Sequence, residues 1–221
     1  KLNENKSIKR IRYTTSHPRD MTNDLIDAHG SCEKLMPLLH LPIQSGSDKI
    51  LKSMNRNHSI SNYLETVTKL KEKNPKIKLT SDFIIAYPGE EEKDFELTCK
   101  LMQEIKFINS YSFIFSPRPG TPASNLKLID EKIAKKRLLV FQNIAEKIKS
   151  KYKETLLNKK LKILFENKIE EDKYFGRDEF QNSVIIRSKK SLIGLEKNII
   201  VKKYNKQTIY GELIENNNLA A

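Results

Sequence analysis

Apolar and polar positions alternate with two periods along the first half of the chain. From Arg10 to about Phe115, short strand-like runs alternate with longer segments of helical period, which predicts βα units around a parallel sheet. The predicted strands are 11–15, 38–44, 77–86 and 110–115. The predicted helices are 22–29, 48–54, 61–73 and 92–105.

The pattern changes after Pro122. Apolar residues recur at helical spacing over 130–156, which predicts one long amphipathic helix. Short β-rich runs then alternate with polar turns and predict five strands, at 161–166, 174–177, 184–187, 199–204 and 208–214. Five strands in about 60 residues are typical of a small antiparallel barrel of the oligonucleotide-binding kind. The expected division is therefore an α/β domain (1–124), a connecting helix (125–157) and a barrel (158–218).

Each of the first four strands has one apolar and one polar face. The apolar faces, which we expect to pack against helices, are Ile11 and Tyr13; Leu39, Leu41 and Ile43; Leu79, Phe83 and Ile85; and Tyr111, Phe113 and Phe115. A parallel sheet covered on both sides is normally apolar on both faces. The polar faces therefore predict a ligand-filled lumen inside an incomplete barrel, and the alternative is an open sheet with one solvated face.

Candidate binding residues gather where these strands end, as expected for α/β folds. His40 and Gln44 share a strand face, and the turn that begins at Ser45 leads into a helix whose free N–H groups either bind an anion or only form a cap. Asp82 is a carboxylate within an apolar strand. Arg56 follows a helix, and Arg118 lies on a loop stiffened by two prolines.

Charge and cysteine content restrict the class of protein. The net charge is +13, which favours a nucleic-acid or other polyanionic partner. Lys outnumbers Arg 33 to 8. The competing explanation is therefore that the lysines are ordinary solvent-exposed residues whose abundance reflects the codon usage of an AT-rich genome.

The cysteine content and the lack of long apolar segments bear on the cellular compartment. The chain has two cysteines, no secretory signal and no apolar run of the ~20 residues that span a bilayer. These features predict a cytoplasmic protein without a membrane segment. The start at Lys1 predicts a fragment or a processed product.

Five segments together resemble the radical S-adenosylmethionine (SAM) methylthiotransferase family. They are 11–18, 40–48, 54–58, 81–90 and 110–123, and the last is most similar to the tRNA-modifying branch. The ribosomal-protein branch usually has acidic residues where Arg118 and Pro119 stand. Gly176, Arg177 and Asn182 are similar to a TRAM domain, a small RNA-binding barrel. The resemblance implies the last four βα units of a (β/α)6 radical SAM barrel, followed by a long helix and a TRAM barrel.

The resemblance also implies a chemistry. Such enzymes use SAM and two 4Fe-4S clusters to add a methylthio group to C2 of N6-isopentenyladenosine next to the anticodon. The residues that would bind SAM or line its lumen are His40, Gln44, Ser45, Arg56, Asp82 and Arg118. Gly176, Arg177 and Asn182 would contact the tRNA anticodon arm.

The chain departs from the family pattern in its cysteines. Cluster-binding Cys-x-x-x-Cys-x-x-Cys is absent, and neither Cys32 nor Cys99 matches a ligand position. We therefore expect no metal ligand in this chain, an inactive isolated polypeptide, an exposed edge strand at Ile11, and a monomer once an N-terminal half is joined. The alternatives are an RNA-binding remnant without catalysis, or a methylthiotransferase of the ribosomal-protein or threonylcarbamoyladenosine branch.

Overall fold

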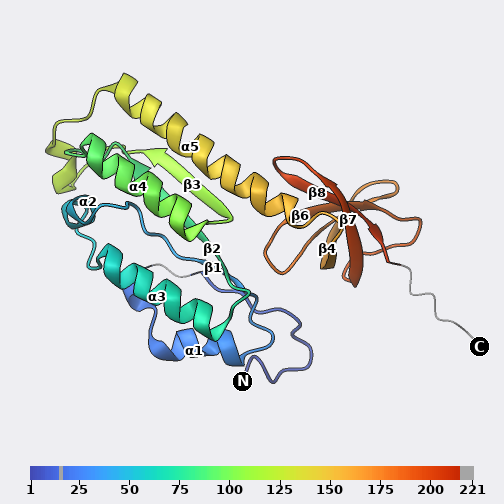
Figure 1. The fold of residues 1–221 in the computed structure, drawn as a ribbon. Coiled ribbons are helices and arrows are strands. Elements are labelled where there is room, and N and C mark those ends of the chain that lie inside the picture. The colour runs from blue at the N-terminus through green and yellow to red at the C-terminus, as the bar shows by residue number, and fades with distance from the viewer. Residues whose placement is uncertain (15–16, 215–221) are drawn as a thin grey trace, which may run out of the picture. The chain divides into compact units, whose positions relative to one another are not determined.

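The computed structural model describes residues 1–14 and 17–214 (Figure 1). The described residues form two compact units, one within Lys1–Lys149 and one within Ser150–Ala221, and the division falls inside the long helix α5 (Glu131–Glu154). Among the described residues, no helix is both long and apolar enough to cross a membrane.

The first unit contains a parallel three-stranded sheet in the order β1-β2-β3. Its strands are β1 (Leu38–His40), β2 (Lys78–Ile85) and β3 (Asn109–Ile114). Its helices, besides α5, are α1 (Asn23–Ser31), α2 (Asp48–Ser53), α3 (Ile60–Lys73) and α4 (Glu92–Ile105), with 3-10 turns η1 (Pro18–Asp20) and η2 (Pro122–Asn125). The predicted helices are confirmed to within about two residues at each end.

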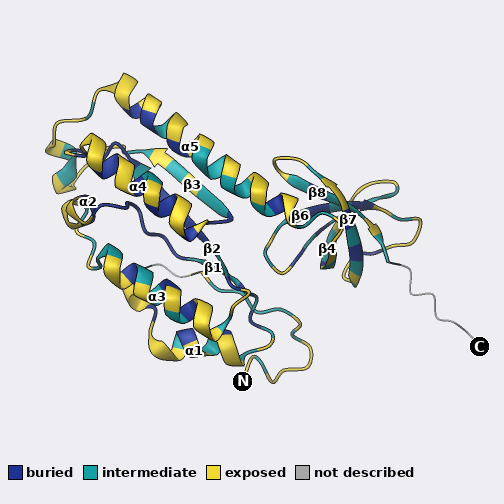
Figure 2. Ribbon diagram, in the orientation of Figure 1, coloured by how far each residue is buried: buried dark blue, intermediate teal, exposed yellow. Residues whose placement is uncertain are grey.

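One face of the sheet is covered by helices. Phe83 of β2 is fully buried, and its ring lies 5.6 Å from the ring of Phe107 and 4.7 Å from that of Phe141 on α5. Tyr63 of α3 and Met102 of α4 belong to the same core. Figure 2 shows buried residues along one side of α3 and α4 and exposed residues along the other. The amphipathic pattern of these helices therefore packs them onto the sheet.

Two predicted strands differ from the sequence expectation. The strand expected at 11–15 is wrong over its described residues, since Ile11 forms only an isolated bridge to Leu35; Thr15 lies outside the described residues. β1 ends at His40 because Pro42 has no N–H to donate to the ladder. The Ser81 hydroxyl compensates there, accepting from the Ile43 N–H at 3.0 Å and donating to the Leu41 carbonyl at 3.0 Å.

The apolar face predicted for the last strand is also wrong. Tyr111 and Phe113 pair in register with Asp82 and Ile84, so they lie on the sheet face opposite the helices. They remain 54% and 59% exposed. Ile114 packs against the helical core instead. Period-two alternation identified the two faces of β3, but it could not tell which of them the helices cover.

The second unit contains a closed five-stranded barrel in the order β4-β5-β6-β8-β7. Its strands are β4 (Lys160–Glu170), β5 (Lys173–Arg177), β6 (Ser183–Arg187), β7 (Glu196–Tyr204) and β8 (Thr208–Leu213). All five predicted strands are confirmed. Four of the five pairings are antiparallel, whereas β6 and β8 are parallel, which corrects the purely antiparallel expectation.

Candidate functional site

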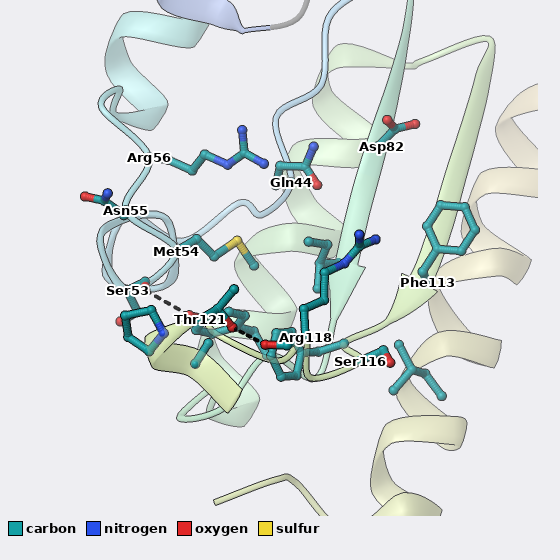
Figure 3. Close-up of a pocket in the computed structure, with 16 residues that line it drawn as sticks. Gln44, Ser53, Met54, Asn55, Arg56, Asp82, Phe113, Ser116, Arg118 and Thr121 are labelled. Atoms are coloured by element: carbon teal, nitrogen blue, oxygen red, sulfur yellow. Dashed lines mark hydrogen bonds between the residues drawn. The ribbon is translucent and has the colours of Figure 1, made fainter. Parts of the chain in front are cut away.

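A cavity of about 850 Å³ lies where β2 and β3 end (Figure 3). Its polar lining includes Gln44, Asn55, Arg56, Asp82 and Arg118, and its apolar lining includes Met54, Ile84, Tyr87, Phe113, Ile114 and Phe115. Four of the six predicted cofactor-binding residues, Gln44, Arg56, Asp82 and Arg118, are therefore brought together. A mostly apolar hollow with a few polar groups is the usual form of a small-molecule site.

Two residues that line this cavity have a strained backbone. Gln44 has a φ of 76° and Asn55 a φ of 56°, in the left-handed region that non-glycine residues rarely adopt. Gln44 is held there by its N–H, which donates to the Asp82 carbonyl at 3.0 Å, and by its carbonyl, which accepts from the Ile84 N–H at 2.9 Å. Such strain is characteristic of binding sites. The Gln44 amide makes no side-chain hydrogen bond to a described residue.

Two Pro-Gly turns hold the loops at the strand ends. Each has an i to i+3 backbone hydrogen bond, from the Glu90 N–H to the Tyr87 carbonyl and from the Thr121 N–H to the Arg118 carbonyl. Gly89 and Gly120 have φ values of 83° and 81°, as the third residue of a type II turn requires. The predicted stiffness of the Arg118 loop thus has a structural basis.

The cavity is positively charged on one side. Arg56 is half-buried, burial lowers its pKa, and among the described residues it is paired with no carboxylate. Burial, followed by the charges of His17 and Arg56, lowers the pKa of His58 to about 4, so His58 is neutral at pH 7. Figure 3 shows the guanidinium groups of Arg56 and Arg118 directed toward the space beside Gln44 and Asp82. An unpaired, partly desolvated guanidinium fits a carboxylate ligand.

His40 and Ser45, the remaining two predicted residues, lie outside the cavity lining. His40 Nε2 is 3.3 Å from Asp82 Oδ2, so His40 contacts a lining residue. Ser45 is fully buried, and its hydroxyl lies 3.3 Å from that of Thr98 on α4. A cofactor-binding role for Ser45 stays a prediction, and the buried position of its hydroxyl does not support that role.

The turn at Ser45 serves to pack α2 against α4. The Gly46 N–H donates to Thr98 Oγ1 at 2.9 Å, and the Ser47 N–H donates to Ser45 Oγ at 3.2 Å. Ser47 caps α2 and donates to Asp94 Oδ1 at 2.7 Å. The N–H groups of Gly46 and Ser47 are therefore already bonded within the chain, and the cap interpretation accounts for this turn.

Sequence reasoning missed a buried ion pair behind the cavity. Arg137 of α5 donates to Glu90 Oε1 at 3.0 Å and to Glu92 Oε2 at 2.9 Å, and the Ala86 N–H donates to Glu90 Oε1 at 3.1 Å. Burial raises the pKa of Glu90 to about 7, although Arg137 and the Ala86 N–H oppose the shift. The pair fixes the turn that carries Tyr87. The only signal in the sequence was an arginine beside an apolar helix face.

The described residues do not form a metal centre. They contain no group of three or more His, Cys, Asp or Glu side chains placed to hold an ion. Cys32 and Cys99 are free thiols, and burial with three nearby glutamates raises the pKa of Cys99 to about 11. Iron–sulfur clusters need several thiolates. The described residues therefore do not fit a cluster. Arg56 and Asp82 in the cavity lining do match the carboxylate, ammonium and hydroxyl groups that SAM carries.

The three predicted RNA-binding residues lie in the barrel. Packing explains the glycine at position 176, because a Cβ there would collide with the Leu164 carbonyl. Arg177 pairs with Glu166 at 2.5 Å and lies over the Phe175 ring at 5.0 Å. The Asn182 amide donates to Asp178 at 2.7 Å and to the Tyr152 hydroxyl at 3.1 Å. Their contacts with RNA stay predictions.

The first part of the chain is similar to a known protein family. Residues 1–102 match the radical SAM superfamily. The solved structure of the radical SAM enzyme coproporphyrinogen III oxidase from Escherichia coli is similar to this chain with a TM-score of 0.50 and 18% sequence identity. The matched region covers 62% of this chain and 31% of the oxidase chain, and the similarity is one of fold. Residues 1–102 are therefore similar to part of a radical SAM domain.

The chain is also similar to proteins named tRNA-2-methylthio-N(6)-dimethylallyladenosine synthase. It is 50% identical to the protein from Pelagibacter ubique, over 97% of this chain and 48% of that protein. It is 44% identical to the protein from Rickettsia typhi, over 94% of this chain and 47% of that protein. The chain spans about half the length of the curated relatives it matches. These similarities confirm the resemblance to the radical SAM methylthiotransferase family.

Proposed function

We propose that this chain forms the SAM-binding wall and the RNA-binding module of a tRNA-modifying radical SAM methylthiotransferase. The proposed parts are the end of a radical SAM barrel (1–124), a connecting helix (125–157) and a TRAM-like barrel (158–218). We place the complete protein in the cytoplasm, as a monomer that includes an N-terminal half. Its substrate would be the N6-dimethylallyladenosine of tRNA, as the names of the relatives indicate.

The observation that carries the proposal is the convergence of Gln44, Arg56, Asp82 and Arg118 on one cavity. Arg56 would hold the carboxylate of SAM, and Asp82 would accept from its ammonium or ribose hydroxyl groups. The Gln44 amide, fixed by its strained backbone, would orient the ligand. When bound, SAM supplies the radical chemistry and the methyl group of the reaction. The residues of this chain bind and orient it.

The clusters would be held outside this chain. A sample reconstituted anaerobically with iron and sulfide should therefore show no stoichiometric 4Fe-4S absorbance and no SAM cleavage. Cluster absorbance together with SAM cleavage would contradict this part of the proposal. Asp82→Asn and Arg56→Met should leave the outcome unchanged, since neither residue would ligate iron.

The barrel would bind the tRNA anticodon arm. From Lys151 onward the chain has 15 basic and 10 acidic residues, and five-stranded barrels of this kind bind oligonucleotides. Binding of an anticodon stem-loop should weaken as salt increases, because phosphate contacts release counterions. Affinity that does not change with salt would contradict an electrostatic RNA interface.

The direct test of the cofactor assignment is equilibrium dialysis of the 221-residue chain with radiolabelled SAM. We expect saturable binding to one site per chain, displaced by unlabelled S-adenosylhomocysteine. Absence of binding at millimolar SAM, combined with tight binding of the stem-loop, would instead favour an RNA-binding protein without a cofactor site.

A further inference from the structure

Two aromatic side chains on β3 face the cavity side of the sheet. Tyr111 and Phe113 are two residues apart, lie on the same strand face, and are each more than half exposed. Register places Tyr111 beside Asp82 and Phe113 beside Ile84. Phe113 lines the cavity, and Tyr111 extends the same strand face beside the lining residue Asp82. A single exposed aromatic residue is ordinary, but an exposed pair next to a cavity is a candidate binding surface. We call Tyr111 and Phe113 the aromatic ledge.

The cavity has chemically different sides. Figure 3 shows Arg56 on the loop that follows α2 and Phe113 on β3, with Gln44 between them. Ile84 and Phe115 continue the apolar lining near Phe113. The volume of about 850 Å³ lies toward the upper end of the roughly 300–1,000 Å³ typical of small-molecule sites. The cavity therefore has room for part of a second ligand beside the one held at Arg56.

We propose that the aromatic ledge stacks the nucleobase of the substrate, and that Ile84 and Phe115 receive the apolar N6 substituent of that base. This inference rests on the proposed function, which supplies the class of base. A purine presents a flat π-face that stacks on aromatic side chains. A branched hydrocarbon substituent, in contrast, gains nothing from the cationic side and is stabilised by apolar contact.

The charges around the ledge favour a nucleoside over a covering layer of protein. Asp82 lies directly beside Tyr111, and Arg118 extends from the loop that follows β3. A packed apolar segment over this face would bury a carboxylate, which is costly without partners. A nucleoside instead brings hydrogen-bond donors and acceptors at its edge while its face contacts the rings.

The absence of tryptophan from the chain gives a selective reporter. Phe113→Trp would introduce the only indole, placed on the ledge. Leu139→Trp, on an exposed position of α5 with 60% exposure, is the matched control. The probe is the free nucleoside N6-dimethylallyladenosine, titrated with S-adenosylhomocysteine present. We expect saturable quenching in Phe113→Trp, none in Leu139→Trp, and about tenfold weaker binding of unmodified adenosine.

Calorimetry with a second pair of variants separates stacking from apolar bulk. Phe113→Leu keeps the ring site apolar but removes the π-face, so nucleoside affinity should fall roughly 5- to 150-fold. Phe113→Tyr should bind as the unmodified chain does. Circular dichroism of each variant must match that of the parent chain.

The outcomes distinguish this inference from the proposed function. If S-adenosylhomocysteine binds but the nucleoside quenches neither reporter, the ledge inference is overturned and the cofactor assignment stands. Equal quenching in both tryptophan variants would also overturn it, since binding would then be non-specific. If neither ligand binds, the proposed function itself fails. Equal affinity for adenosine would overturn the assignment of Ile84 and Phe115.

Discussion

His40 Nε2 lies 3.3 Å from Asp82 Oδ2, while His40 Nδ1 lies 2.9 Å from Thr80 Oγ1. The three side chains form a connected row on the sheet face opposite the helices. Only Asp82 lines the cavity. His40 therefore acts through Asp82, as a residue that orients the carboxylate toward a ligand.

Removal of this orienting contact should weaken cofactor binding with little loss of stability. In His40→Ala we expect the affinity for S-adenosylhomocysteine to fall by about tenfold, because a hydrogen bond to a charged group contributes about 1.5–3 kcal/mol. Thr80→Ser, which keeps the hydroxyl, should bind as the parent chain does. Calorimetric titration measures both, and unchanged affinity in His40→Ala would refute an orienting role.

Gly46 should tolerate no side chain. A Cβ there would lie 2.5 Å from Thr98 Cα and 2.6 Å from the Leu97 carbonyl oxygen, both backbone atoms of α4. Gly46→Ala should therefore lower the free energy of unfolding by about 3 kcal/mol. Gly89→Ala is the control, since its Cβ would meet open space and only the positive φ costs about 1 kcal/mol. Urea unfolding followed by circular dichroism should rank the two variants in this order.

Glu90 should make the stability of the first unit depend on pH. Burial raises its pKa from 4.5 to about 7, so the folded state favours the protonated carboxyl. The stabilisation is complete below about pH 4.5 and is lost as pH rises through about 7, with an upper limit of about 3 kcal/mol. Glu90→Gln keeps an acceptor for Arg137 and cannot titrate.

The difference in unfolding free energy between the parent chain and Glu90→Gln isolates this group from the histidines. We expect the variant to gain stability relative to the parent between pH 5 and pH 8. A difference that stays constant over this range would show that Arg137 holds the Glu90 pKa near its ordinary value.

Asn182 should behave as a structural residue of the second unit. Its amide joins Asp178, whose pKa is raised by burial, to the Tyr152 hydroxyl. Asn182→Ala should lower the free energy of unfolding of the second unit by about 2 kcal/mol, because the substitution leaves buried polar groups without a hydrogen-bond partner. Thermal unfolding measures the loss. If the variant keeps its melting temperature but loses affinity for the anticodon stem-loop, Asn182 contacts RNA instead.

The sequence predicted those parts of the fold that depend on residues close together in the chain, and it failed where residues far apart in the chain interact. Helices with clear amphipathic faces and N-caps, such as α3 with Ser59, could be read from local pattern. Pro42 is a local sign that β1 ends early, but the Ser81 hydroxyl that satisfies the freed backbone groups comes from another strand, and no local pattern reveals it. The exposure of Tyr111 depends likewise on which sheet face the helices cover.

The sequence predicted the site residues that stand at strand ends, but not those whose positions depend on contacts with distant helices. Gln44, Asp82 and Arg118 stand at or near the ends of strands that the sequence marks, and parallel strands bring such positions together. Ser45 was indistinguishable from them in sequence, yet its partner Thr98 lies on α4 and draws it into the interior. Arg137 supports the site from a helix that follows the sheet in sequence, so motif spacing gave no sign of it.

The central claim, that the cavity binds SAM with its carboxylate at Arg56, can be tested with two ligands and two variants. S-adenosylhomocysteine carries the amino acid moiety, and 5′-methylthioadenosine lacks it. In calorimetric titrations, Arg56→Met should weaken S-adenosylhomocysteine roughly 10- to 150-fold and leave 5′-methylthioadenosine unchanged. Arg19→Met, at a side chain 58% exposed, should alter neither. Equal effects of Arg56→Met on both ligands, or no effect on either, would contradict the account.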